Sequence, residues 1–223
     1  MHQVVDTLHL QDVVIRSISV SEMENNVYLL TSKETGHQVL IDAADDPAAI
    51  AELVESGVAD GPGEEPSVVT VLTTHRHWDH VRALGEIAER YGATTVAGVN
   101  DAEAIAEQPG GAPIELTVSH QDVLSQGGIA LRCIELRGHT PGSIGYVYTD
   151  PDGTTVLFSG DSLFPGGPGK TNSPEEFASL MDDLQERVFG VLEDDVHVFP
   201  GHGSATTIGT ERPQIPEWLA RGW

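Results

Sequence analysis

Apolar residues occur along this chain in short runs that predict both strands and helices. Alternating or continuous runs of about four to eight residues, bounded by turn residues, are typical of strands. They predict strands at residues 13–20, 27–31, 38–42, 68–73, 94–98, 114–118, 129–136, 143–148 and 154–158. Helices are predicted at residues 47–55, 81–91 and 101–107 and from Pro174 onward. The last helix has one apolar face with a spacing of 3 and 4, formed by Phe177, Leu180, Met181, Leu184 and Val188.

One predicted strand leads directly into the densest polar cluster of the chain, His-Arg-His-Trp-Asp-His at residues 75–80. Residues two apart in an extended segment share a face, so His75 and His77 can point at one metal ion. Asp79 and His80, one turn later, can point at a second ion. Buried imidazoles and carboxylates each need a partner, and divalent cations satisfy all of them together. The cluster therefore predicts a metal site on a strand-to-helix turn.

Three further candidate ligands follow at wide spacing, each in a turn. His139 lies in Gly-His-Thr-Pro-Gly-Ser, Asp161 in Phe-Ser-Gly-Asp-Ser, and His202 in Phe-Pro-Gly-His-Gly. Each follows a short β-rich stretch, so the loops can open at one end of a sheet. The other histidines are expected to be surface or structural residues: His2, His9, His37, His120 and His197.

These motifs, in this order, resemble those of the metallo-β-lactamase-fold hydrolases, and most closely the glyoxalase II-like, single-domain branch. The resemblance implies an α/β fold, a four-layer α/β/β/α sandwich with the metals at the edge shared by its two sheets. It also implies two divalent metal ions, zinc in the first instance, with iron and manganese as alternatives. By motif, the first metal would be held by His75, His77 and His139, and the second by Asp79, His80 and His202. Asp161 would bridge the two ions.

A dinuclear site predicts hydrolysis, because metals polarise a carbonyl and lower the pKa of bound water toward neutrality. The nucleophile would be a metal-bound hydroxide, with Asp79 and Asp161 as the catalytic carboxylates and no serine or cysteine nucleophile required. Ser143 and Ser162 do not belong to a Gly-x-Ser-x-Gly elbow and are expected to be turn or supporting residues. Asp42, at the end of a predicted strand, is expected either to orient a metal-binding histidine or to cap the following turn.

The predicted substrate is a small thioester or acyl ester, with hydroxyacyl-thiol esters suggested by the resemblance. The loop at residues 164–172 follows Asp161 and is expected to border the active-site mouth. Its Gly169-Lys170-Thr171 is not a nucleotide-binding loop, because the first glycine of that motif would fall at Phe164. Lys170 is expected either to hold a substrate carboxylate or to be a solvated loop lysine. Only 21 residues follow His202, so the helical C-terminal domain of full-length glyoxalase II is not expected, and glutathione specificity is not implied.

Other functions remain as alternatives. Persulfide dioxygenases share this fold but use one iron held by two histidines and an aspartate, here His75 or His77 with His139 and Asp161. Lactonase or β-lactamase-like hydrolysis is less favoured, because common β-lactamases have a cysteine where this chain has Asp161. The only cysteine, Cys133, lies in an alternating stretch and is expected to be a small buried residue. A binding protein with an inert metal site is least favoured, since every expected ligand is present.

Length and composition predict the number of domains, the cellular location and the class of partner. The 223 residues are expected to form a single domain, residues 1–223. No apolar run reaches the roughly 18 residues that a membrane helix needs, and no secretory signal is visible, so a cytoplasmic protein is expected. The net charge of −24 comes from 35 acidic and 11 basic residues, which disfavours a nucleic-acid partner. The sequence leaves the oligomeric state open.

Overall fold

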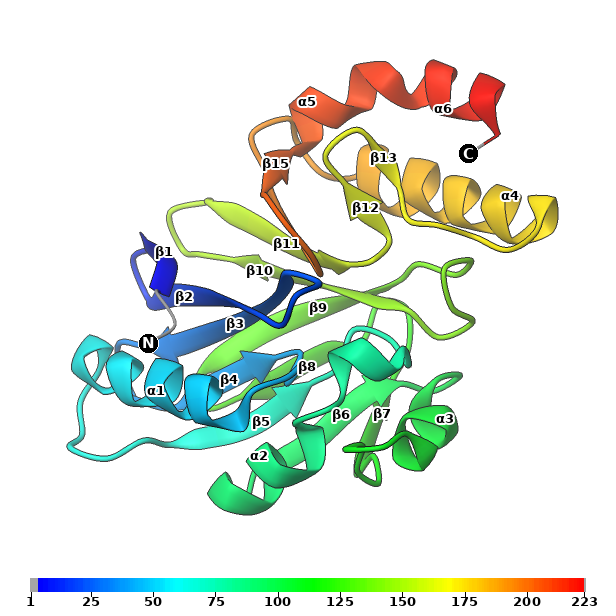
Figure 1. Cartoon of the computed structure of the whole chain (residues 1–223). Helices are drawn as coiled ribbons and strands as arrows, with labels where there is room; N and C mark the ends of the chain where they lie inside the picture. Colours follow the sequence, from blue (N-terminus) through cyan, green and yellow to red (C-terminus); the bar gives the residue numbers. More distant parts are fainter. Residues whose placement is uncertain (1–3, 223) are drawn as a thin grey trace.

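Two β-sheets form the middle of the protein in a computed structural model that describes residues 4–222 (Figure 1). The first sheet has the order β1-β2-β3-β4-β5-β6-β7, antiparallel from β1 to β4 and parallel from β4 to β7. Its strands are β1 (Val4–His9), β2 (Val13–Val20), β3 (Asn25–Ser32), β4 (Gln38–Ile41), β5 (Val68–Leu72), β6 (Thr94–Gly98) and β7 (Leu116–Val118).

The second sheet has the order β15-β14-β11-β10-β9-β8 and is antiparallel except for the parallel pair of β11 and β14. Its strands are β8 (Val123–Gln126), β9 (Ile129–Glu135), β10 (Ile144–Thr149), β11 (Thr155–Gly160), β14 (His197–Pro200) and β15 (Thr206–Thr207). A separate hairpin consists of β12 (Leu163–Phe164) and β13 (Gly167–Pro168).

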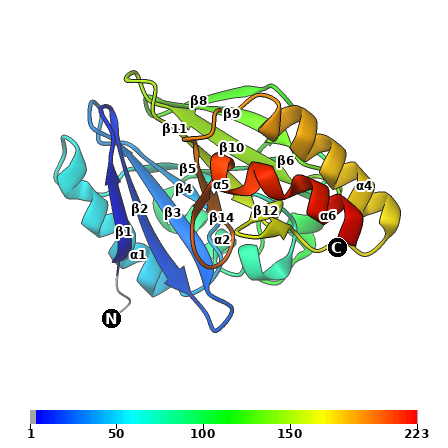
Figure 2. The same cartoon turned by 90° about the horizontal axis from the view of Figure 1, so that it is seen from above.

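Helices cover the outer face of each sheet (Figures 1 and 2). The helices beside the first sheet are α1 (Pro47–Gly57), α2 (Leu84–Tyr91) and α3 (Ala102–Glu107). The helices beside the second sheet are α4 (Pro174–Asp183), the π-helix η3 (Leu184–Phe189), α5 (Ile208–Glu211) and α6 (Ile215–Arg221). Short 3₁₀ turns complete the chain at η1 (Val58–Asp60), η2 (Trp78–His80) and η4 (Arg212–Gln214). The arrangement is the expected four-layer α/β/β/α sandwich.

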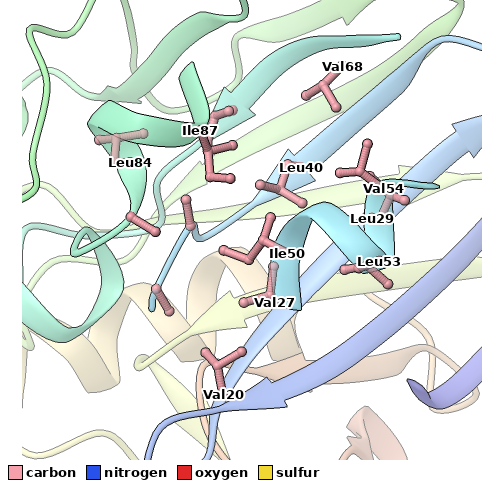
Figure 3. Packing of buried hydrophobic residues seen from close by; sticks show 14 of the residues in the cluster. Val20, Val27, Leu29, Leu40, Ile50, Leu53, Val54, Val68, Leu84 and Ile87 are labelled. Carbon is pink, nitrogen blue, oxygen red and sulfur yellow. The ribbon is translucent and has the colours of Figure 1, made fainter. Parts of the chain in front are cut away.

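The central strands contribute to two cores, because successive side chains point to opposite faces of a sheet. On β3, Val27 and Leu29 pack against α1, whereas Tyr28 and Leu30 lie between the sheets. Figure 3 shows the first of these cores, where Ile50 and other apolar residues of α1 and α2 cover the first sheet. The predicted apolar face of α4 and η3 packs on the second sheet. Cys133 is fully buried between the sheets, as expected.

Most predicted elements agree with the structure, but the hairpin β12–β13, strand β15 and the C-terminal helices α5 and α6 were not predicted. Strands β1 and β8 were not predicted, because both are edge strands with exposed polar side chains and lack a clear apolar pattern. The helix predicted from Val81 begins at Leu84, because η2 occupies the preceding residues with a tighter turn closed by the His80 N–H and the His77 carbonyl. Among residues 4–222, no helix is both long and apolar enough to cross a bilayer.

Candidate metal centre

The candidate ligands lie in loops that leave the carboxyl ends of neighbouring strands. Strands β4 and β5 are parallel neighbours, so Asp42 lies beside the loop at residues 75–80. Strands β11 and β14 are also parallel neighbours, which brings Asp161 beside His202. Parallel neighbours end at the same edge of a sheet, and ligand sites of α/β proteins form there.

Backbone hydrogen bonds join the two sheets at this edge. The Ile144 N–H donates to the Thr74 carbonyl at 2.8 Å, and the Asn26 N–H donates to the Gly201 carbonyl at 2.8 Å. The Tyr28 hydroxyl donates across the sheets to the Pro200 carbonyl at 2.7 Å. The loops from both sheets are thereby fixed around a common centre.

The structure brings all seven predicted ligands together in overlapping groups. Within each group the ligand atoms lie within 4.8 Å of one another. The groups found among residues 4–222 are His75, His77 and His139; His75, His80 and Asp161; and Asp79, His80 and His202. The second group connects the other two, so the centre is continuous.

Asp161 lies between the two outer groups. Its Oδ2 is 3.6 Å from Nε2 of His139 and 3.5 Å from Nε2 of His202. Its Oδ1 is 3.5 Å from Nε2 of His80. One carboxylate thus faces histidines from both groups.

Two buried atoms of the centre lack the partners that buried polar atoms need. Within the described residues, Nε2 of His75 and Oδ1 of Asp161 have no hydrogen-bond partner. An unsatisfied buried polar atom is costly, and a bound cation satisfies both a nitrogen lone pair and a carboxylate oxygen. The donor set therefore fits one or two divalent metal ions.

Three of the five histidines, His80, His139 and His202, are held through Nδ1, the ring nitrogen that faces away from the centre. Nδ1 of His80 lies 2.9 Å from Oδ2 of Asp42, which also accepts from the Thr74 hydroxyl. Nδ1 of His139 lies 2.7 Å from the Lys170 carbonyl, and Nδ1 of His202 lies 2.8 Å from the Met23 carbonyl. In the neutral ring, an N–H directed at each oxygen leaves the inner nitrogen available as a ligand. Asp42 therefore orients a histidine, and it also accepts the Thr74 N–H of the following turn at 2.8 Å.

Burial and charge divide the histidines into two kinds. Burial lowers the pKa of His75 well below its usual value, and His80 lowers it further. Burial and the neighbouring His139 likewise lower the pKa of His77. Burial alone would lower the pKa of His80 and His202, but Asp161, aided by Asp42 or Asp79, raises each to about 10. His75 and His77 are thus neutral. His80 and His202 carry a positive charge that the neighbouring carboxylates stabilise.

Several supporting residues were not predicted from the sequence. Asn25 Nδ2 donates to both the carbonyl and Oδ2 of Asp79 at 3.1 Å. Buried Asp101 joins two ligand loops, because it accepts from the Arg76 N–H at 3.0 Å and from the Thr140 hydroxyl at 2.5 Å. Only the short side chain of Asp101 at a helix start hints at such a role in the sequence.

Three polar side chains around the centre, those of Ser143, Tyr146 and Arg137, have structural partners. Ser143 is buried and shares a 2.6 Å hydrogen bond with Thr140. Ser162 is also buried, but its hydroxyl has no hydrogen-bond partner among the described residues. The Tyr146 hydroxyl donates to the Thr73 carbonyl at 3.1 Å. Arg137 pairs with Asp183 at 2.7 Å.

A cavity of about 430 Å³ opens beside the centre. It is lined by His139, Asp161 and the segment from Phe164 to Lys170. Lys170 is exposed at this cavity. The predicted surface histidines lie elsewhere: His9 and His197 are exposed, His37 and His120 are half-buried, and His2 is outside the described residues.

Comparison with known proteins gives one family match. The model of the metallo-beta-lactamase superfamily matches residues 21–206. Hydroxyacylglutathione hydrolase GloC of Haemophilus influenzae is 29% identical over 217 residues, which cover 91% of this chain and 96% of that protein.

Two further relatives differ in length. A hydroxyacylglutathione hydrolase of a Bradyrhizobium species is 30% identical over 80% of this chain, but the match spans only 62% of that protein. The crystal structure of ETHE1 from Myxococcus xanthus has a TM-score of 0.74 and 28% identity, covering 91% of this chain and 83% of the other.

Proposed function

Because the chain belongs to the metallo-β-lactamase superfamily, we propose that it is a metal-dependent hydrolase of small thioesters or acyl esters. The observation that carries this proposal is the position of Asp161 between two groups of three ligands. A carboxylate shared by two ligand groups is suited to bridging two ions.

We assign the ligands of each ion from the groups of side chains whose ligand atoms lie close together. The first ion would be held by His75, His77 and His139 and the second by Asp79, His80 and His202, with Asp161 shared. Two divalent ions, zinc in the first instance and iron or manganese as alternatives, supply an activated water and polarise the substrate carbonyl. We assign Asp79 and Asp161 as the catalytic carboxylates. Their negative charge would balance part of the positive charge of the two ions. Asn25 keeps Oδ2 of Asp79 directed at His202, which lies 3.3 Å away.

The substrate class rests on similarity and on one basic side chain. Similarity to the hydroxyacylglutathione hydrolases supports a thioester. Lys170 is exposed beside Asp161 in a chain with a net charge of −24. An ammonium group there would bind a substrate carboxylate.

A second candidate is a mononuclear iron persulfide dioxygenase. His75 or His77 with His139 and Asp161 would hold the iron, and the likeness to ETHE1 fits this alternative. The two candidates differ in metal content and in co-substrate.

The test combines metal analysis with two assays. Protein purified without added metal is analysed for metal, then supplied with a panel of thioesters, lactones and persulfides. Two metals per chain with thiol release from thioesters is the expected result. One iron per chain with oxygen uptake on persulfides would overturn the hydrolase in favour of the dioxygenase.

A further inference from the structure

The hairpin β12–β13, which forms one wall of the cavity beside Asp161, is attached at both ends. At one end, the Lys170 carbonyl accepts from Nδ1 of His139 at 2.7 Å. At the other end, the Gly166 N–H in the hairpin turn donates to Oε2 of Glu211 at 2.9 Å. The first attachment is to the candidate metal centre, and the second is to the C-terminal segment.

Glu211 is a buried carboxylate, with 1% of its surface exposed. Besides Gly166, it accepts from the Thr206 hydroxyl at 2.6 Å and from Gln214 Nε2 at 3.3 Å. A charged side chain is rarely buried to this extent without several donors. Two of these donors flank Glu211 in β15 and η4, and the third is in the hairpin, so Glu211 links the hairpin to the C-terminal segment.

The helix α6 packs behind the same hairpin. Trp218 of α6 is 1% exposed and belongs to the core on the second sheet. A methyl group at Gly167 would lie 3.2 Å from Nη2 of Arg221 and 3.9 Å from Nε1 of Trp218. Figures 1 and 2 show α6 lying against the hairpin. The C-terminal segment therefore supports the wall from outside, while the cavity lies on its inner side.

We propose that Glu211 is a positioning residue that holds the hairpin β12–β13 and thereby sets which thioesters bind in the cavity. The inference rests on the proposed hydrolase function. A long thiol carrier would lie along the hairpin wall, whereas a compact thioester would reach only the centre at Asp161 and His139. Loss of the Glu211 side chain removes the protein acceptor of the Gly166 N–H and frees the wall, so binding of the long substrate weakens.

The test compares variants of Glu211 on two probe substrates, S-lactoylglutathione as the long thioester and S-acetyl-N-acetylcysteamine as the compact one. For Glu211→Ala, we expect KM for the long thioester to rise about fivefold, with kcat and metal content nearly unchanged. KM for the compact thioester should stay the same. Glu211→Gln should restore the wild-type ratio, because its amide can accept from Gly166 and donate to Thr206. Glu217→Gln is the matched control, an exposed acidic residue on the same C-terminal segment.

Hydrogen exchange gives a second readout that is independent of hydrolysis. Amide exchange of Leu163, Phe164, Gly166 and Gly167 should become about tenfold faster in Glu211→Ala and keep the wild-type rate in Glu211→Gln. Should Glu211→Ala fail to fold, Glu211→Asp carries the test, because its shorter side chain withdraws from Gly166 and keeps the charge. An unchanged ratio of the two KM values, or unchanged exchange, would overturn the role of Glu211. Absence of thioester hydrolysis in the wild-type protein would instead overturn the proposed function and the substrate claim with it.

Discussion

Asp42 accepts a hydrogen bond from Nδ1 of His80 at 2.9 Å, on the turn that follows β4. Its backbone has a φ of 57°, a left-handed conformation that only Gly, Asn and Asp adopt at low cost. The same carboxylate accepts the N–H and the hydroxyl of Thr74. Asp42 therefore fixes both the start of the ligand loop and the tautomer in which His80 offers Nε2 to the centre.

The variant Asp42→Asn separates these two roles. Asparagine tolerates the left-handed backbone, and its Oδ1 can still accept the Thr74 N–H, but the NH2 group that replaces Oδ2 cannot accept the N–H of His80 Nδ1. We expect normal folding and a loss of affinity for the second metal of about 10- to 100-fold, measured by titration with a competing chelator. Asp150→Asn, at a buried aspartate that accepts the N–H groups of Gln11 and Asp12, is the control and should keep full metal affinity. Unchanged affinity in Asp42→Asn would contradict the orienting role.

Much of the candidate centre was predictable because its ligands are adjacent in the chain or follow a strand. His75, His77, Asp79 and His80 lie within six positions, so one turn places them together. Asp42 was also predictable as an acidic residue after a strand. These signals depend only on local geometry and residue type.

Other parts of the site carry no local signal. His139 and His202 are held by the carbonyls of Lys170 and Met23, and any residue type has a carbonyl. Asn25 contacts Asp79 from a strand 54 positions away. The edge strands β1 and β8 expose polar side chains, so the apolar pattern that reveals buried strands is missing there.

Position 201 requires glycine because Asp161 and His80 lie too close to its backbone for a larger residue. A Cβ atom at this position would lie 2.2 Å from Oδ1 of Asp161 and 2.7 Å from Cε1 of His80. Gly201→Ala should therefore displace the shared carboxylate, with loss of bound metal and at least about a hundredfold fall in kcat/KM. Metal analysis and steady-state kinetics provide the measurement.

Gly203→Ala is the control for this variant. No atom lies within 4 Å of a Cβ at Gly203, whose φ of 66° makes alanine strained. It should cost about 1 kcal/mol of stability without loss of metal. Full metal content and activity in Gly201→Ala would refute the displacement of Asp161.

Metal binding should depend on pH in two stages. The lowered pKa values of His75 and His77 leave their nitrogens free at neutral pH. His80 and His202, with pKa values of about 10 in metal-free protein, must lose protons before they bind a metal. We expect about one metal per chain near pH 6 and two at higher pH, with proton release during the second step. Equal pH dependence of both binding steps would contradict the assignment of neutral histidines to the first metal and protonated histidines to the second.

His80 and His202 also determine how the stability of metal-free protein changes with pH. Their folded-state pKa is raised above the usual 6.5, so their stabilisation is fully present below about pH 6.5. It is lost as pH rises through about 10. The Tm of chelator-treated protein should therefore fall over this range, while that of metal-loaded protein should not follow it.

Lys170 and Lys33 are the two lysines of the chain, and together they allow a matched test of substrate charge. Lys170 is exposed at the cavity beside Asp161, so its ion pair with a substrate carboxylate would contribute only about 0.2–1 kcal/mol. Lys170→Ala should accordingly raise KM for an anionic thioester by about two- to fivefold and leave kcat unchanged. Added salt should raise KM for the wild-type protein and have little effect on the variant, because screening and substitution remove the same attraction. Lys33→Ala is the control. The Lys33 side chain donates to the Leu10 carbonyl and does not line the cavity, so its removal takes away an equal charge and should keep the wild-type KM. If both variants behave alike, Lys170 acts only through net charge and the substrate carboxylate is bound elsewhere.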